Sequence, residues 1–265
     1  MISHFKRPMK RLLYGYCPGF AGAFPYFGSK VYFPKNSVSF RAACDQGVFE
    51  ADNVRILEAL VRPDAVMFDV GANIGLMAIP VLKNEPKCRI VSFEPSMNVL
   101  PYLERTIAEN AFRDRWTLVK KAVGAQTGRV TFSLSDQANS LFDGIRPTQR
   151  VATVRQVEVD LTTVDQTWRE LGLPRVSNLK IDVEGAEFGV LQGARDCLRA
   201  EQPAVLLEWN RVNLAAYDCS PDRLLDFANE MNFQLFAVPG LVEITSLLQL
   251  GLHMGFTENF LLLPR

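Results

Sequence analysis

Short runs of apolar residues alternate along the chain with segments whose apolar residues recur every three or four positions. Runs at 66–70, 89–93 and 116–119 are separated by helix-type segments containing Leu76–Leu82 and Val99–Ile107. Short apolar runs are typical of buried strands, and the longer spacing is typical of helices packed on one face. The order strand–helix–strand–helix–strand predicts a parallel sheet with right-handed crossovers.

The rhythm is interrupted in the middle of the chain and then returns. Residues 129–134 and 154–159 alternate in the manner of β-strands, with a polar loop at 135–150 between them. This stretch predicts a β-rich, antiparallel insertion after the third core strand, with its loop near the site. A single helix is expected at 188–198. Further core strands are expected at 178–183, 203–207, 233–238 and 259–263.

The first 44 residues differ from the rest in charge. No acid precedes Asp45, whereas the basic residues are Lys6, Arg7, Lys10, Arg11, Lys30, Lys35 and Arg41. One interpretation is an extension that packs on the domain or caps its site. The other is an arm that covers the substrate, or an interfacial segment near anionic lipid. We therefore divide the chain into a basic, aromatic extension, 1–44, and one domain, 45–265.

Composition narrows the class of protein. Of 265 residues 48% are hydrophobic, and Lys plus Arg equals Asp plus Glu at 29 each, so the overall charge does not favour a polyanion binder. Five scattered cysteines without a CxxC pair indicate reduced thiols. No apolar run reaches the roughly 20 residues of a membrane span, and Pro and Gly interrupt any signal-peptide core. We expect a cytoplasmic protein whose membrane contact, if present, is peripheral.

A glycine-containing turn follows the strand at 66–70. At Gly71 and Gly75 the backbone can approach a ligand closely, and the next helix presents free N–H groups. The spacing is not the G-x-G-x-x-G of dinucleotide sites, and Asp69 directly before the turn suits a pyrophosphate poorly. A ligand with an ammonium for Asp69 and ribose hydroxyls for Glu94 fits better. S-adenosylmethionine has these groups.

Four predicted strands end in acids: Asp69, Glu94, Asp182 and Glu208. Ligands of open α/β sheets bind outside the carboxyl ends of the strands, so these side chains are expected around one site. The alternative is that each acid caps the helix that follows it.

With these features the chain resembles the FkbM family of S-adenosylmethionine-dependent O-methyltransferases, over approximately residues 45–263. The segment KIDVEGAE, at 180–187, is the most specific part, since ordinary class I methyltransferases lack it. The resemblance implies an α/β fold, a doubly wound, mostly parallel sheet of seven strands, and methylation of a hydroxyl on a sugar, glycan or natural product. It is carried by GVFE (47–50), FDVGANIG (68–75), SFEP (92–95), KKAVG (120–124), LKIDVEGAEFGVLQG (179–193) and LLEWN (206–210).

The resemblance also implies roles for individual residues. The turn residues shape the cofactor site, Glu94 holds the ribose, and Ala122 lies beside the adenine. Glu50 approaches the methionine end, and Ser140 lies near the site. The predicted cofactor-binding residues are therefore Glu50, Asp69, Gly71, Asn73, Gly75, Glu94, Ala122, Ser140 and Asp182.

Methyl transfer to a hydroxyl requires that its proton be taken as the bond forms, or that a metal lower its pKa. Buried carboxyls with raised pKa values suit the first route, and Asp182, Glu184 and Glu208 are the candidates. Lys180 shares a strand face with Asp182, and it is either catalytic or part of a buried ion pair.

A metal is not required by this scheme. Asp182, Glu208 and Asn210 nevertheless form an all-oxygen set of a kind that suits Mg²⁺. His253, near the C-terminus, is a weaker candidate base.

Two other functions stay open. The basic N-terminus would suit a nucleic-acid methyltransferase, but DVEG (182–185) stands where amino-group methyltransferases carry an Asn/Asp-Pro-Pro-aromatic motif. A binding protein that has kept the cofactor fold without catalysis is the third possibility.

Overall fold

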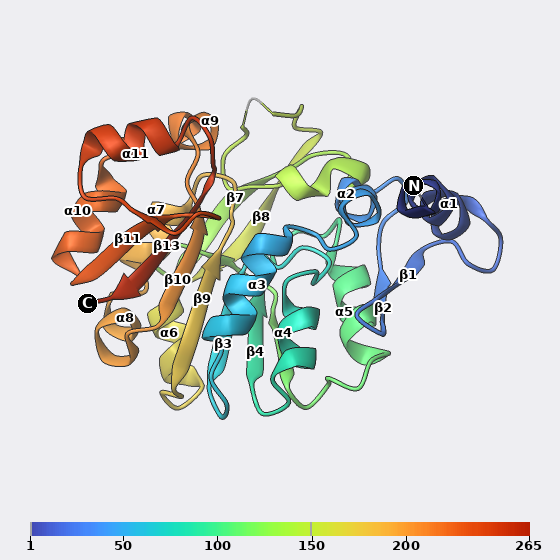
Figure 1. Cartoon of the computed structure of the whole chain (residues 1–265), viewed down its shortest axis with the longest axis horizontal. Helices are drawn as coiled ribbons and strands as arrows, with labels where there is room; N and C mark the ends of the chain where they lie inside the picture. Colours follow the sequence, from blue (N-terminus) through green and yellow to red (C-terminus); the bar gives the residue numbers. More distant parts are fainter. Residues whose placement is uncertain (1, 149) are drawn as a thin grey trace.

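The computed structural model describes residues 2–148 and 150–265, and the side chains among them from residue 8 onward. Within these residues the main sheet has eight strands in the order β12-β11-β13-β10-β9-β3-β4-β5 (Figure 1). They are β3 (Val66–Val70), β4 (Arg89–Phe93), β5 (Trp116–Val119), β9 (Val176–Ile181), β10 (Ala204–Glu208), β11 (Phe233–Ala237), β12 (Val242–Glu243) and β13 (Asn259–Pro264).

The sheet is mostly parallel, as predicted. β5, β4, β3, β9 and β10 pair in parallel, whereas β13 runs antiparallel between β10 and β11. The expected seven strands are present, and β12 adds an eighth at the edge. It was missed because two exposed residues are too short to show an alternating pattern.

Helices cover both faces of the sheet, which makes it doubly wound. Alternate residues of β3 supply both cores: Phe68 packs on one side and Met67 on the other. The Met67 side holds α3 (Ala51–Leu60), α4 (Ala78–Asn84) and α5 (Leu100–Ala108). The Phe68 side holds α6 (Val164–Glu170), α7 (Glu187–Gln192), α8 (Arg195–Glu201), α9 (Arg211–Ala216), α10 (Arg223–Glu230) and α11 (Leu247–His253).

The single helix expected at 188–198 is wrong. The chain forms α7 and α8 instead, with Gly193 at the C-terminal end of α7. A Cβ at Gly193 would lie 2.1 Å from the carbonyl oxygen of Gly124, so this backbone packs directly on another segment. Local spacing cannot reveal such a close approach.

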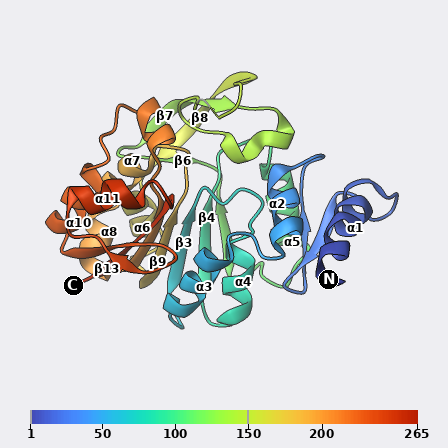
Figure 2. The same cartoon turned by 45° about the horizontal axis from the view of Figure 1, so that its top comes forward.

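The predicted β-rich insertion is confirmed. It contains β6 (Ala122–Val123), β7 (Gly128–Leu134) and β8 (Arg155–Thr162), and β7 pairs antiparallel with β8. The loop between β7 and β8 holds a short 3₁₀ helix, η1 (Gln137–Phe142), whose N-terminus is capped by Asp136. Figure 2 shows β6, β7 and β8 at the top of the view, beyond the main sheet.

The N-terminal segment contributes to the same core. It forms α1 (Ile2–Tyr16), a hairpin of β1 (Ala23–Tyr26) and β2 (Ser29–Tyr32), and α2 (Val38–Gln46). Aromatic side chains from the hairpin and α2 pack into the core on the Met67 side. The predicted division at 44/45 falls inside α2, in a segment whose aromatic side chains share the core of the domain. The division of the chain into two units stays a prediction. No helix of the described residues is long and apolar enough to cross a membrane.

Candidate functional site

A cavity of about 540 Å³ lies at the carboxyl ends of β3, β4 and β9. Seven of the predicted site residues line it: Gly71, Asn73, Glu94, Ala122, Ser140, Asp182 and Glu184. The insertion closes one side with residues that the sequence did not single out: Phe132, Leu141, Asp143 and Ile145.

The turn after β3 depends on its two glycines for different reasons. Gly71 has φ +80°, and a Cβ there would lie 1.8 Å from the carbonyl oxygen of Asp182. Gly75 has φ +87°, and its Cβ would lie 2.6 Å from the Trp116 ring. Gly75 therefore permits packing against the core and does not line the cavity. Between them, Asn73 takes φ +49°, which asparagine tolerates better than most residues.

Glu94 holds this turn from the end of β4. Its two carboxylate oxygens accept hydrogen bonds from the backbone N–H groups of Asn73 and Ser96, both at 2.8 Å. The side chain is only 5% exposed, and burial raises its pKa to about 7 despite those two bonds. Glu94 thus presents an acceptor to the cavity that becomes fully charged only above neutral pH.

Asn73 also connects the turn to the walls of the cavity. Its Nδ2 donates to the backbone oxygen of Ser140 at 3.4 Å, and its Oδ1 accepts from Ser39 Oγ at 2.9 Å. Ser140 belongs to η1 and Ser39 to α2. The amide therefore links the insertion and the N-terminal segment to the central sheet.

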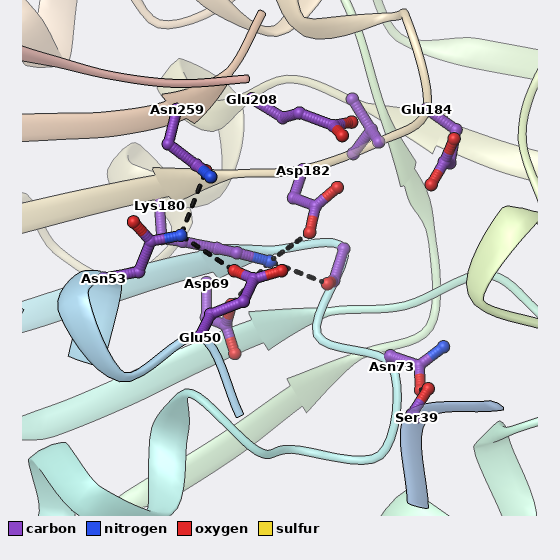
Figure 3. Close-up of polar contacts among 12 residues, drawn as sticks. Ser39, Glu50, Asn53, Asp69, Asn73, Lys180, Asp182, Glu184, Glu208 and Asn259 are labelled. Atoms are coloured by element: carbon purple, nitrogen blue, oxygen red, sulfur yellow. Dashed lines mark hydrogen bonds and ion pairs between the residues drawn. The ribbon is translucent and has the colours of Figure 1, made fainter. Parts of the chain in front are cut away.

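Lys180 lies beneath the turn, where three groups surround its ammonium (Figure 3). It lies 3.8 Å from Asp69 Oδ1 and 3.3 Å from Asp182 Oδ2, and it donates to the Gly71 carbonyl oxygen at 3.1 Å. Two roles were considered for Lys180, a catalytic group and a member of a buried ion pair. These contacts favour the ion pair.

Asp69 is fully buried. It lines neither the cavity of about 540 Å³ nor the smaller cavity that Glu50 lines. Its other oxygen accepts from Ser92 Oγ at 3.3 Å. Burial raises the pKa of Asp69, and Lys180 opposes that rise. The structure thus places the predicted ammonium partner beneath the turn, in contact with Lys180 and Ser92.

Asp182, Glu184 and Glu208 form an acid cluster. One carboxylate oxygen from each of the three lies within 4.8 Å of the others. Asn213, on α9, donates through Nδ2 to Glu184 at 2.9 Å and to Glu208 at 3.0 Å. Arg150, from the insertion loop, brings its guanidinium to 3.7 Å from Glu184 and 3.6 Å from Glu208.

The pKa values of this cluster are displaced upward. Burial and repulsion from Asp182 raise the pKa of Glu184 to about 8, although Arg150 lowers it. The same two causes raise the pKa of Glu208 well above its usual range. Two carboxyls that ionise with difficulty, bridged by one amide, can hold or accept a proton near neutral pH.

Glu50 lies in a second, smaller cavity of about 210 Å³, together with Lys180, Asp182 and Glu208. Its carboxylate accepts from Asn53 Nδ2 at 2.7 Å, and burial raises its pKa. Glu50 lines this second cavity and not the first, and its place at the methionine end stays a prediction.

Of the predicted Mg²⁺ set, Asp182 and Glu208 bring carboxylate oxygens within 4.8 Å of each other, and the set stays a prediction. Asn210 Oδ1 accepts from the backbone N–H of Asn213 and caps α9. The third carboxylate of the cluster is Glu184, and Arg150 already supplies a positive charge there. His253 lies at the end of α11 and lines none of the described cavities.

Sequence reasoning missed Arg150, Asn213 and Glu187. Arg150 stands in a polar loop without a motif. Asn213 could have been suspected, because an Asn-x-x-Asn pattern starts α9. Glu187 belongs to the quoted motif, and its carboxylate accepts from the backbone N–H groups of Val183 and Gly185, each at 3.0 Å, which fixes the loop after β9.

Comparison with known proteins identifies a family for this chain. A family model described as "Methyltransferase FkbM domain" matches residues 69–235. The chain is 27% identical to the 2-O-methyltransferase NoeI of Sinorhizobium fredii, over 54% of this chain and 63% of that protein. It is 28% identical to the hexuronic acid methyltransferase AglP of Haloferax volcanii, over 57% of this chain and 59% of that protein.

A longer match covers a small part of a large protein. The AMB antimetabolite synthetase AmbE of Pseudomonas aeruginosa is 28% identical over 66% of this chain and only 10% of its own length. The chain therefore spans between a tenth and about three fifths of these relatives. Among solved structures, an FkbM methyltransferase from Methylobacillus flagellatus aligns with 84% of this chain and 54% of its own at a TM-score of 0.47 and 17% identity.

Proposed function

Because the chain belongs to the FkbM methyltransferase family, we propose that it uses S-adenosylmethionine to methylate a hydroxyl group of a sugar, glycan or natural product. The observation that carries the proposal is one continuous site. A glycine turn with a buried Glu94 stands at one end, and the acid cluster around Glu184 at the other. Asp182 lies between them.

The residues of the cavity fit this cofactor. Glu94 offers a carboxylate to the two ribose hydroxyls, and Phe93 and Val123 form apolar walls next to Ala122 for the adenine. Asp182, partly exposed, is the acid that faces the methionine end. When bound, the cofactor supplies an electrophilic methyl group.

The acid cluster supplies the base. Glu184 is the leading candidate, because its pKa of about 8 is close to neutrality and it lines the cavity that Asp182 shares. Glu208 is held beside it, because Asn213 Nδ2 donates one hydrogen bond to each of the two carboxyls. A positioned base of this kind contributes about 10²- to 10⁴-fold to the rate.

The acceptor class rests on the relatives. One is named a 2-O-methyltransferase and another a hexuronic acid methyltransferase. Both names are compatible with a polar acceptor whose hydroxyl reaches a carboxylate. We carry the sugar hydroxyl over to this chain as the first class to test.

The test measures transfer of a labelled methyl group from S-adenosylmethionine to hydroxylated acceptors, alongside calorimetry of cofactor binding. Glu94→Gln is expected to weaken binding about 10- to 100-fold, because a charged acceptor of two hydroxyls is replaced by a neutral one. Glu104→Gln, an exposed carboxylate on α5, serves as the control.

Unchanged affinity in Glu94→Gln would refute the assigned cofactor site. Tight binding without transfer to any hydroxyl acceptor would favour the non-catalytic alternative. Label found in nucleic acid, with steep salt dependence, would favour the nucleic-acid alternative.

A further inference from the structure

An exposed apolar stripe runs along α1. Met9, Leu12 and Tyr16 are 64%, 58% and 61% exposed, and their spacing of three and four residues places them on one helical face. Phe20, 57% exposed, continues the stripe in the turn that follows. Large apolar side chains collected in this way are a surface that water does not favour, unlike single exposed residues.

The other side of α1 is attached to the protein. Arg11 forms an ion pair with Asp45 at the end of α2, and Tyr14 packs against the core on the Met67 side. The Tyr14 carbonyl oxygen also accepts from the Gly22 N–H at 3.0 Å. Figure 1 shows α1 at the edge of the molecule, beyond α2. The helix is therefore held in place with its apolar stripe facing outward.

Every charged residue in the sequence of α1 is basic. Lys10 is exposed next to Met9, and Lys6, Arg7 and Arg11 belong to the same helix. No acid occurs before Asp45, and Asp45 is already paired with Arg11. The partner that complements this surface is therefore apolar inside and anionic at its face.

We propose that α1 and the turn at 17–22 dock on a membrane surface that carries anionic lipid headgroups. The four apolar side chains lie at the boundary of the acyl chains, and Lys10 contacts headgroup phosphates. A nucleic acid would satisfy the basic residues but leave the stripe in water, and an acidic protein as the partner would leave the protein unbound in the vesicle test below.

A second exposed apolar surface provides a comparison for the role of charge in lipid binding. Leu248, Leu252 and Phe256, on and after α11, are 73%, 58% and 91% exposed. No Lys or Arg occurs between 247 and 256, although Arg211 of α9 donates to the Gly251 carbonyl oxygen beside this surface. It supplies a matched control for α1.

α1 is connected to the glycine turn through α2. Arg11 of α1 pairs with Asp45 of α2, and Ser39 of α2 donates to Asn73 in the turn.

The test is flotation of the whole chain with vesicles. Neutral phosphatidylcholine vesicles are compared with vesicles containing about 30% phosphatidylglycerol, and salt is raised from roughly 0.1 M to about 1 M. We expect binding to the anionic vesicles only, weakened by salt. Leu12→Glu and Lys10→Glu should each lower the partition coefficient about tenfold.

Leu252→Glu is the control, because Leu252 and Leu12 have the same 58% exposure. It should bind vesicles as the unchanged protein does, and all variants should keep the same thermal unfolding. The proposal is overturned if Leu12→Glu binds normally, if Leu252→Glu fails to bind, or if neutral vesicles bind equally well.

Discussion

Lys180 neutralises carboxylates that the sequence had assigned to separate tasks. Burial lowers its pKa, but Asp182, Asp69 and Glu50 outweigh burial and hold that pKa above the ordinary lysine value. The ammonium therefore stays charged and cannot serve as a base. Through its bond to the Gly71 carbonyl oxygen it positions the turn, and we assign it that role instead of a catalytic one.

Glu184→Gln tests the assigned base at the scale of one residue. Burial first, and Asp182 second, raise the pKa of Glu184 to about 8. Below that pH the carboxyl is protonated and cannot accept a proton, so kcat should rise with pH through about 8. The variant should lose about 10²- to 10⁴-fold in kcat with little change in cofactor affinity. Rate measurements from pH 6 to 9 test both statements.

The free energy of unfolding should change with pH in the opposite direction to kcat. A carboxyl whose folded pKa lies above its unfolded value contributes stability that is complete below the unfolded pKa and is lost as pH rises through about 8. Glu184→Gln should flatten that part of the stability curve. An unchanged kcat profile in the variant would assign the base to another group.

At the scale of elements, the turn between β3 and α4 is set by contact with the strand beside it. Gly71 leaves no room for a side chain because the Asp182 backbone, directly after β9, lies against it. Neighbouring parallel strands therefore shape the cofactor turn as much as its own sequence does.

Gly71→Ala should be more costly than a left-handed glycine alone explains. Gly172 has φ +78°, nearly the +80° of Gly71, but nothing lies within 4 Å of a Cβ added there. Gly172→Ala should cost about 1 kcal/mol, whereas Gly71→Ala should cost about 3 kcal/mol or more. Urea unfolding of both variants measures the difference. Equal losses would show that the contact with Asp182 contributes nothing.

At the scale of the whole molecule, Arg150 joins three distant parts of the chain. It leaves the insertion loop, approaches Glu184 and Glu208 at the sheet edge, and donates to Glu258 before β13 at 3.0 Å. The acid cluster is therefore covered by a cation from a segment with no sequence motif.

Arg150→Met should shift the pH dependence of the reaction. Arg150 lowers the pKa values of Glu184 and Glu208, so its removal should raise both, and the rise of kcat should move to higher pH. Arg146→Met is the control, because Arg146 pairs with the exposed Asp218 and not with the cluster. Identical profiles for both variants would contradict the electrostatic role of Arg150.

Local pattern was enough for most of the fold. The core strands and the antiparallel pair in the insertion have periodicities that only one type of structure buries well. The helix at 2–16 received no prediction, and it contains Pro8. Gly193 divided a predicted helix for a reason visible only in its contact with Gly124.

By itself the sequence predicted the glycine turn at Gly71 and the acids at the strand ends, because these are local features of the chain. Only the tertiary structure decided the surroundings of each acid. It buried Asp69 against Lys180, left Glu94 facing the cavity, and placed Glu184 and Glu208 on one amide. The reason is physical: the pKa and the reach of a carboxylate depend on burial and on charges brought from distant segments.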